Sequence, residues 1–255
     1  MLDQVGATRY VTPLREGGSL PGIVEADDLG TYVVKFRGAG QGLKVLVAEV
    51  IVGELARALA IRSPRLVVID LPEPIATHEA DEEVQDLLTA SLGRNLGVDY
   101  LPGSFGYDGN TPPPASEAAD ILWLDAFTAN VDRTWHNPNL LVWHGRTWTI
   151  DHGAALYFHH SWPRRPPDPE RFAAQPFDPT GHVLAGIAAP LDAAHERLAP
   201  RLPELVDDVL DAIPDDWLEP TEWLADPAAL RAAYREHLLA RIQRPGAWLP
   251  GGGQA

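Results

Sequence analysis

Two short polar motifs beside an apolar strand pair constrain this chain more than any other feature. The first lies in residues 130–142, NVDRTWHNPNLLV, and the second in residues 148–153, WTIDHG. Residues 144–146, HGR, form a turn signal between them, so we expect the two apolar runs to form a β-hairpin. A hairpin folds the chain back on itself and can bring Asp132 and Asp151 to one end. Carboxylates and amides are oxygen ligands of the kind that Mg²⁺ prefers, so the pattern predicts a site for metal and phosphate.

Phosphoryl transfer gives these residue types a chemical reason to occur together. It needs a carboxylate for the acceptor hydroxyl, an amide and a second carboxylate for Mg²⁺, and a lysine for the phosphates. Asp132 and Asp151 supply the two carboxylates. The amide is either Asn137 or Asn139. The structural alternative is a surface hairpin with solvated acids and Asn residues that cap turns.

Composition narrows the classes of partner and compartment. The chain has 255 residues, enough to bury a sizeable core, and it carries a net charge of −16 with a pI near 4.8. Nucleic acids and anionic membranes attract clustered Lys and Arg, so we expect neither as the main partner. There is no cysteine, which excludes disulfides and thiolate metal sites. No apolar run resembles a secretion signal or a membrane span, and we expect a cytoplasmic protein.

The N-terminal part predicts a three-stranded meander that carries a lysine. Three runs are rich in β-branched and aromatic residues: residues 7–14, 23–26 and 31–36. The loop between the first two runs contains Gly17, Gly18 and Ser19, whose backbone N–H groups can approach phosphates closely, although a plain hairpin turn has the same composition. Lys35 lies in the otherwise apolar third run. It must either reach solvent at a sheet edge or meet an anion.

An apolar helix is expected to follow this lysine. Residues 45–59 are apolar around most of the helix circumference, so an acid on its inner side needs a partner. Glu49 and Glu54 are the two candidates. Glu54 has a natural surface partner in Arg57, three residues later, and we therefore choose Glu49 as the inner acid.

The remaining pattern predicts an α+β chain in two lobes. Further strands are expected at residues 65–70 and 97–103, and helices at residues 84–92, 116–129, 183–188, 193–198, 202–213 and 227–241. Ser116 and Asp226 are candidate helix caps. Because strands come first and helices later, we expect an N-terminal antiparallel sheet with one helix in residues 1–103. A mostly helical lobe should then occupy residues 104–255.

The two motifs resemble the catalytic and metal-binding segments of the protein-kinase-like superfamily. Asp132-Arg133, residues 139–142 (NLLV) and residues 150–153 (IDHG) are similar to those of HipA-like and phosphoinositide-type kinases. In these families the Asn follows the catalytic Asp by five residues, which gives Asn137. The apolar strand that should follow the Asn begins only after Asn139, and we favour Asn139 for the metal. His152 replaces the Phe of many kinases, which puts a Phe-based switch in doubt.

The resemblance implies a two-lobed kinase-like fold and an ATP- and Mg²⁺-dependent phosphotransferase. Lys35 is then expected to contact the α- and β-phosphates and Glu49 to pair with Lys35. Asp132 would act on an acceptor hydroxyl, of a protein Ser or Thr or of a small molecule, while Asn139 (or Asn137) and Asp151 bind Mg²⁺. Kinases of this kind hold adenine through backbone groups at the link between the lobes. By position, that link is expected at Val98, Asp99, Tyr100 and Leu101.

Two other functions are compatible with the same residues. A degenerate kinase fold could bind nucleotide or a partner without catalysis, and a transfer assay discriminates it from a kinase. An unrelated Mg²⁺-dependent hydrolase could use the same acids, but such an enzyme has no use for Lys35 or for the glycine loop.

Overall fold

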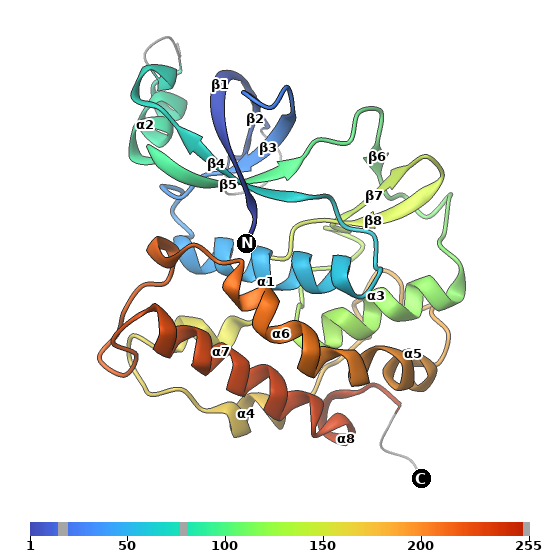
Figure 1. Ribbon diagram of the computed structural model, residues 1–255. Helices are drawn as coiled ribbons and strands as arrows, with labels where there is room; N and C mark the ends of the chain where they lie inside the picture. The colour runs from blue at the N-terminus through green and yellow to red at the C-terminus, as the bar shows by residue number, and fades with distance from the viewer. Residues whose placement is uncertain (15–19, 77–80, 252–255) are drawn as a thin grey trace. The chain divides into compact units, whose positions relative to one another are not determined.

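The computed structural model describes residues 1–14, 20–76 and 81–251 (Figure 1). Strands and helices are both abundant, so the predicted α+β class is confirmed. The chain divides into two compact units. Unit 1 comprises Met1–Leu46 and Pro64–Pro102, and unit 2 comprises Val47–Ser63 and Gly103–Ala255. No helix in the described part of the chain is both long enough and apolar enough to cross a membrane.

The described strands and helices occur in the following order along the chain. The strands are β1 (Asp3–Pro13), β2 (Gly22–Ala26), β3 (Thr31–Lys35), β4 (Leu66–Leu71), β5 (Gly93–Asp99), β6 (Phe105–Gly106), β7 (Leu140–Trp143) and β8 (Arg146–Thr149). The α-helices are α1 (Leu43–Ala58), α2 (Glu82–Ala90), α3 (Ala115–Thr128), α4 (Pro169–Ala173), α5 (Leu191–Leu198), α6 (Leu202–Asp211), α7 (Pro227–Ile242) and α8 (Pro245–Trp248). Short 3₁₀ helices are η1 (Glu73–Ala76), η2 (Tyr157–Ser161), η3 (Ala199–Arg201) and η4 (Asp215–Trp217).

Unit 1 is built on a closed barrel in the order β1-β2-β3-β5-β4. The predicted meander of β1, β2 and β3 is confirmed, and its pairings are antiparallel. The barrel closes because the first residues of β1, from Asp3 to Gly6, pair in parallel with β4. The sheet is therefore mixed where a purely antiparallel one was expected. The register of β1 against β2 shifts twice, and such bulges bend a strand enough to serve two neighbours.

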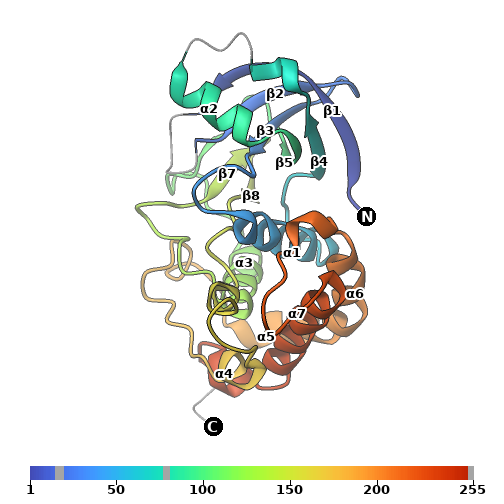
Figure 2. The ribbon, with the colours of Figure 1, turned by 90° about the vertical axis from the view of Figure 1, so that its left-hand side faces the viewer.

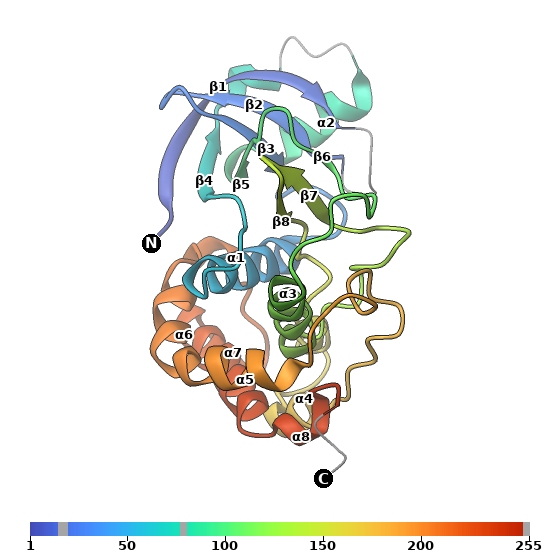
Figure 3. The ribbon, with the colours of Figure 1, turned by 90° about the vertical axis from the view of Figure 1, so that its right-hand side faces the viewer.

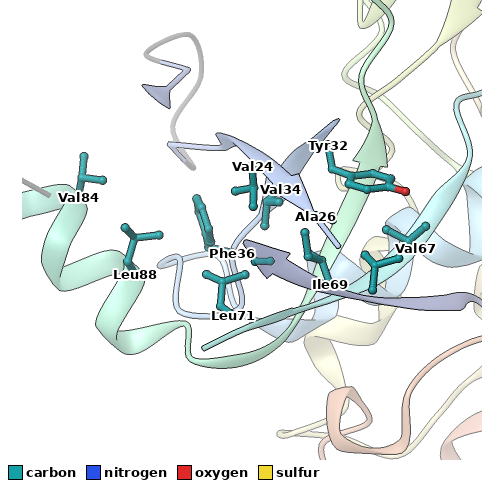
Figure 4. Packing of buried hydrophobic residues seen from close by; sticks show 12 residues of the cluster. Val24, Ala26, Tyr32, Val34, Phe36, Val67, Ile69, Leu71, Val84 and Leu88 are labelled. Atoms are coloured by element: carbon teal, nitrogen blue, oxygen red, sulfur yellow. The ribbon is translucent and has the colours of Figure 1, made fainter. Parts of the chain in front are cut away.

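Buried apolar side chains of β1, β2, β3 and β4 form one hydrophobic cluster with Phe36 and with residues of α2. Figure 4 shows Phe36 and Leu71 near Val84 and Leu88, which project from α2. Each fully buried Val, Leu or Phe contributes about 1.5–3 kcal/mol to the free energy of unfolding. This packing fixes the position of β3, the strand that carries Lys35, within unit 1.

Unit 2 is mostly helical. Within it α3 packs against α5 and α7, and α7 packs against α4 and α6 (Figures 2 and 3). The rings of Trp123 and Phe127 on α3 stack at 5.5 Å, and Trp248 of α8 meets both. The buried guanidinium of Arg241 donates to the carbonyl of Ala126 at 2.7 Å. These contacts fix α3, the helix that leads into the first polar motif.

The expected hairpin is confirmed. β7 and β8 pair antiparallel around the turn His144-Gly145, and β6 extends this small sheet at β7. Both turn residues have positive φ values, 48° and 69°, as a tight two-residue hairpin turn requires. The hairpin thus begins directly after Asn139 and ends just before Ile150 and Asp151.

Two local expectations were wrong. Residues 183–188 do not form a helix: residues 183–187 are turns, in which the N–H of Ile187 donates to the Leu184 carbonyl at 3.0 Å, and Gly186 in the middle of the segment is a poor helix former. Helix α3 begins at Ala115 after Pro114, so Ser116 is inside the helix and is not its cap. The cap at Asp226 is confirmed, since its side chain accepts from the N–H of Ala229 at 2.8 Å.

Candidate active site

The segment that carries Asp132 leaves α3 through a sharp turn and ends at β7; we refer to residues 130–139 as the Asp132 loop. Ala129 is left-handed (φ 54°), and its N–H donates to the carbonyl of Asp125, which ends the helix. Further along, the N–H of Thr134 donates to the Asn137 carbonyl at 3.0 Å, and the N–H of Asn137 donates to Thr134 Oγ1 at 3.2 Å. Both of these hydrogen bonds lie within the Asp132 loop.

Both candidate amides contact Asp132. Asn137 Nδ2 donates to Asp132 Oδ2 at 2.8 Å, and Asn139 Nδ2 lies 3.3 Å from the same oxygen. A carboxylate only accepts, so the NH₂ group of each amide must face it. Neither amide oxygen accepts a hydrogen bond from the residues that the structure describes. Each Oδ1 can therefore serve as a metal ligand while Nδ2 keeps Asp132 oriented.

Asn139 and Asp151 lie at the same end of the hairpin. Leu140 pairs with Thr149, and beyond this pair the N–H of Ile150 donates to the Asn139 carbonyl at 3.0 Å. Asn139 (φ 48°) and Asp151 (φ 54°) are both left-handed, a conformation that Asn and Asp adopt more readily than most residues. Asn139 is thus bonded to the residue that precedes Asp151, whereas the backbone of Asn137 bonds within the loop.

The donor set fits Mg²⁺ better than a transition metal. Across residues 1–14, 20–76 and 81–251, no group of three or more His, Cys, Asp and Glu side chains could hold a metal ion. One carboxylate with one or two amide oxygens leaves most of a coordination sphere to waters and phosphates. That arrangement is usual for Mg²⁺ in nucleotide sites, and Asp151 with Asn139 would supply the protein ligands.

Arg133 is buried and joins the Asp132 loop to the hairpin. Its Nη1 donates to the carbonyl of Asn139 and, at 3.3 Å, to that of Ile150. Its Nε donates to Asp125 Oδ2 at 2.5 Å, and its Nη2 lies 3.3 Å from Asp125 Oδ1. Nη2 also lies 3.3 Å from His152 Nδ1, which must accept because a guanidinium only donates. One cation therefore bonds to the residues on both sides of the hairpin base.

Asp125 on α3 is the buried counter-ion of Arg133. Its carboxylate also accepts from Asn130 Nδ2 and from His182 Nε2, each at 2.9 Å. Burial alone would raise the pKa of Asp125, but the charge of Arg133 and hydrogen bonds from His182 and Arg133 hold the pKa below its ordinary value. Asn130 Oδ1 in turn accepts from the N–H of Asp132 at 3.2 Å. The charged pair is thus connected to the backbone of Asp132 itself.

Part of this network was missed from the sequence. Asp125 is an acid among the apolar residues 121–127, which signals a buried carboxylate that needs a partner, and Arg133 is the first cation that follows it. His182 gives no local signal, because its partner Asp125 is 57 residues away in the chain.

Lys35 is the last residue of β3 and is half-buried. Tyr32 and Val34 alternate with it and point into the barrel, so Lys35 stands on the outer face with Thr31 and Val33. The alternation explains how an apolar strand accommodates a lysine without placing its charge in the core. Its role toward phosphate stays a prediction.

The two glutamates of α1 differ in burial, as their neighbours in the sequence predict. Glu49 is buried, only 2% exposed. Glu54 is less buried and accepts from Arg57 at 2.8 Å. The predicted surface pair of Glu54 is therefore confirmed, and Glu49 is the inner acid of the helix. Its pairing with Lys35 stays a prediction.

The expected adenine-binding stretch lies at the end of β5 in unit 1. Val98 and Asp99 belong to the strand, and Tyr100 and Leu101 follow it. The N–H groups of Asp99 and Tyr100 already donate to barrel carbonyls, at 2.9 and 3.0 Å. An adenine contact here would therefore have to use carbonyl groups or the N–H of Leu101. The predicted glycine loop, Gly17, Gly18 and Ser19, lies outside the described residues.

Comparisons with known proteins identify the family and the type of fold. Residues 8–250 match the sequence model of a family described as HipA-like kinase. No curated protein matches the chain. In fold the chain is similar to the crystal structure of the Helicobacter pylori proinflammatory kinase CtkA, with a TM-score of 0.52 and 10% identity over 96% of this chain and 95% of that one. At this identity the likeness shows the fold alone. The family match spans nearly the whole chain, which therefore belongs to the HipA-like kinase family, as the two motifs predicted.

Proposed function

We propose that this chain is an ATP- and Mg²⁺-dependent kinase that transfers the γ-phosphate to a hydroxyl group, of a protein Ser or Thr or of a small molecule. Family membership supports the kinase class. The observation that carries the proposal is the contact of Asp132 Oδ2 with two amides, one of which adjoins Asp151 at the hairpin base. In a solvated surface hairpin, nothing would require two amides to contact the same carboxylate oxygen.

Asp132 is the proposed base. Its carboxylate accepts the proton of the acceptor hydroxyl as the acceptor oxygen forms a bond to the γ-phosphorus. The bond from that phosphorus to the oxygen bridging the β- and γ-phosphates breaks, and ADP leaves with the electron pair. The amide groups of Asn137 and Asn139 keep the carboxylate in one orientation, so little reorganisation is needed during transfer.

Asn139 Oδ1 and the carboxylate of Asp151 are the proposed ligands of Mg²⁺. When bound, the ion neutralises phosphate charge and polarises the group that is transferred. Arg133 fixes the backbone carbonyls of Asn139 and Ile150, and so sets the positions from which both ligands extend.

Unit 1 is proposed to contribute to nucleotide binding. Lys35 would neutralise the α- and β-phosphates, and residues 98–101 would contact adenine through their backbone. Glu49, in the part of α1 that belongs to unit 2, is proposed to orient Lys35. We retain the expected lobes, residues 1–103 and 104–255, as part of this proposal. The net charge of −16 makes nucleic acids and anionic membranes poor partners and leaves a hydroxyl acceptor of another kind.

Calorimetric titration of the protein with ATP tests the proposal. We expect affinity in the presence of Mg²⁺ to fall about tenfold or more when EDTA is added or when Asp151 is replaced in Asp151→Ala. Asp207→Ala is the matched control, because it removes an exposed acid of unit 2 that pairs with Arg235 on α7. It should bind ATP as the wild type does. Equal affinity with EDTA, or in Asp151→Ala with Mg²⁺, would contradict the metal assignment.

A further inference from the structure

His182 reaches the Asp132 loop from a segment that sequence reasoning gave no role. The backbone of His182 forms an isolated antiparallel bridge with Thr134. The next residue, Val183, donates its N–H to the carbonyl of Arg133 at 3.0 Å. The side chain of His182 is buried and its Nε2 lies 2.9 Å from Asp125 Oδ2. The backbone of His182 therefore contacts the Asp132 loop, while its side chain contacts Asp125, the counter-ion of Arg133.

The hydrogen bonds of the ring fix its tautomer. His182 Nδ1 accepts from the N–H of Leu184 at 3.1 Å, so this nitrogen carries no proton. The ring proton is then on Nε2, which donates it to Asp125. A neutral imidazole therefore supplies one donor to a carboxylate whose other donors are Asn130 and Arg133.

The contact continues from Asp125 to the proposed metal ligands. Arg133 shares the oxygen Asp125 Oδ2 with His182, and its Nη1 holds the carbonyls of Asn139 and Ile150. Without the His182 donor, Asp125 Oδ2 would lose a hydrogen bond in the buried interior. We expect the Asp125 carboxylate to rotate toward Arg133 and Asn130. The Arg133 guanidinium would then move away from the carbonyls of Asn139 and Ile150.

We propose that His182 is a positioning residue, which acts through Asp125 and Arg133 to set the backbone that carries Asn139 and Asp151. The inference rests on the proposed function, since it assigns these two residues to Mg²⁺. It adds that the segment around His182, which has no regular structure, is required for the metal site to assemble. Groups that hold metal ligands in place commonly matter as much as the ligands themselves.

Two substitutions at His182 separate positioning from packing. Removing Asp125 or Arg133 would strand the other charge in the interior, and loss of the fold would hide the effect. His182→Gln places an amide NH₂ near the former Nε2 and keeps the donor to Asp125. His182→Asn places its oxygen near the former Nδ1 and keeps the acceptor for Leu184, but it loses the donor to Asp125. Both remove the ring, so their melting temperatures serve as the control for packing.

Two readouts compare these variants. The first is the Mg²⁺ affinity at saturating ATP, measured by calorimetry. We expect it to fall about 10- to 100-fold in His182→Asn and to stay near the wild-type value in His182→Gln. The second is amide hydrogen exchange without nucleotide. Peptides that cover residues 130–139 and 150–153 should exchange faster in His182→Asn alone.

The experiments distinguish failure of the positioning role of His182 from failure of the proposed function. Equal behaviour of the two variants in both readouts, whether both are impaired or both are normal, would overturn the positioning role. If the wild type bound no ATP with Mg²⁺, the proposed function would fail. The exchange comparison alone would then decide whether His182 sets the backbone at Asn139 and Ile150.

Discussion

Asn137 and Asn139 both donate to the carboxylate of Asp132. Replacing each of them separately shows which one is the metal ligand. We predict that Asn139→Ala lowers turnover by about 100-fold and Asn137→Ala by less than about tenfold, because only Asn139 adjoins Asp151 through the hairpin. Initial rates of ADP formation at saturating Mg²⁺ and ATP measure both.

The left-handed backbone of Asn139 requires a control. An alanine at φ 48° costs about 1–2 kcal/mol of stability by itself, and this cost could be mistaken for a lost ligand. Asn139→Gly removes the amide without that strain and should lose the same activity. The reverse ranking, with Asn137 more sensitive, would place the metal ligand five residues after Asp132.

Residues with a local motif were predictable, and residues that act over long distances were not. Asp132, Asp151 and the two amides are near one another in sequence, and a hairpin was enough to bring them together. Burial of Glu49 followed from its apolar neighbours. The contacts of Arg133 with the carbonyls of Asn139 and Ile150 could not be predicted, because backbone groups leave no signature in side-chain patterns.

Among the secondary-structure elements, the β7–β8 hairpin brings the two polar motifs together. Replacing Gly145 in its turn tests how much the hairpin depends on the turn. Gly145 has φ 69°, and a Cβ added there would meet nothing within 4 Å, so Gly145→Ala isolates the backbone conformation. We predict a loss of about 1–2 kcal/mol in the free energy of unfolding, measured by urea denaturation.

Gly106→Ala is the matched control for the turn. Gly106 lies in β6 of the same sheet, its φ is ordinary and the space around it is open. It should unfold at the wild-type urea concentration. Equal losses in the two variants would show that the effect at Gly145 does not come from its left-handed backbone.

Regular elements were predictable where periodicity or a cap marked them. α7 follows its cap Asp226, and β7 and β8 follow the turn residues. Residues 183–188 are apolar enough for a helix, yet they form turns around Gly186. The N–H of Val183 bonds to the Arg133 carbonyl, a tertiary contact that local patterns do not encode.

At the scale of the whole molecule, the order of strands before helices was sufficient for the α+β class. Closure of the barrel was not predictable, because it depends on the parallel pairing of residues 3–6 with β4, some sixty residues later. The chain belongs to the HipA-like kinase family, and its polar motifs lie in the mostly helical unit. We propose that these parts together perform phosphotransfer.

The most direct test is transfer of labelled γ-phosphate from ATP, with Mg²⁺, to pools of protein and metabolite acceptors and to the protein itself, by wild type and by Asp132→Asn. Asn keeps the shape of Asp132 but cannot accept the hydroxyl proton, so we predict that transfer falls by about 10²- to 10⁴-fold. Nucleotide affinity, measured by calorimetry, should change by no more than a few fold. Undiminished transfer by Asp132→Asn would contradict the assignment of the base. Tight ATP binding by the wild type without any transfer would show a nucleotide-binding module in place of a kinase.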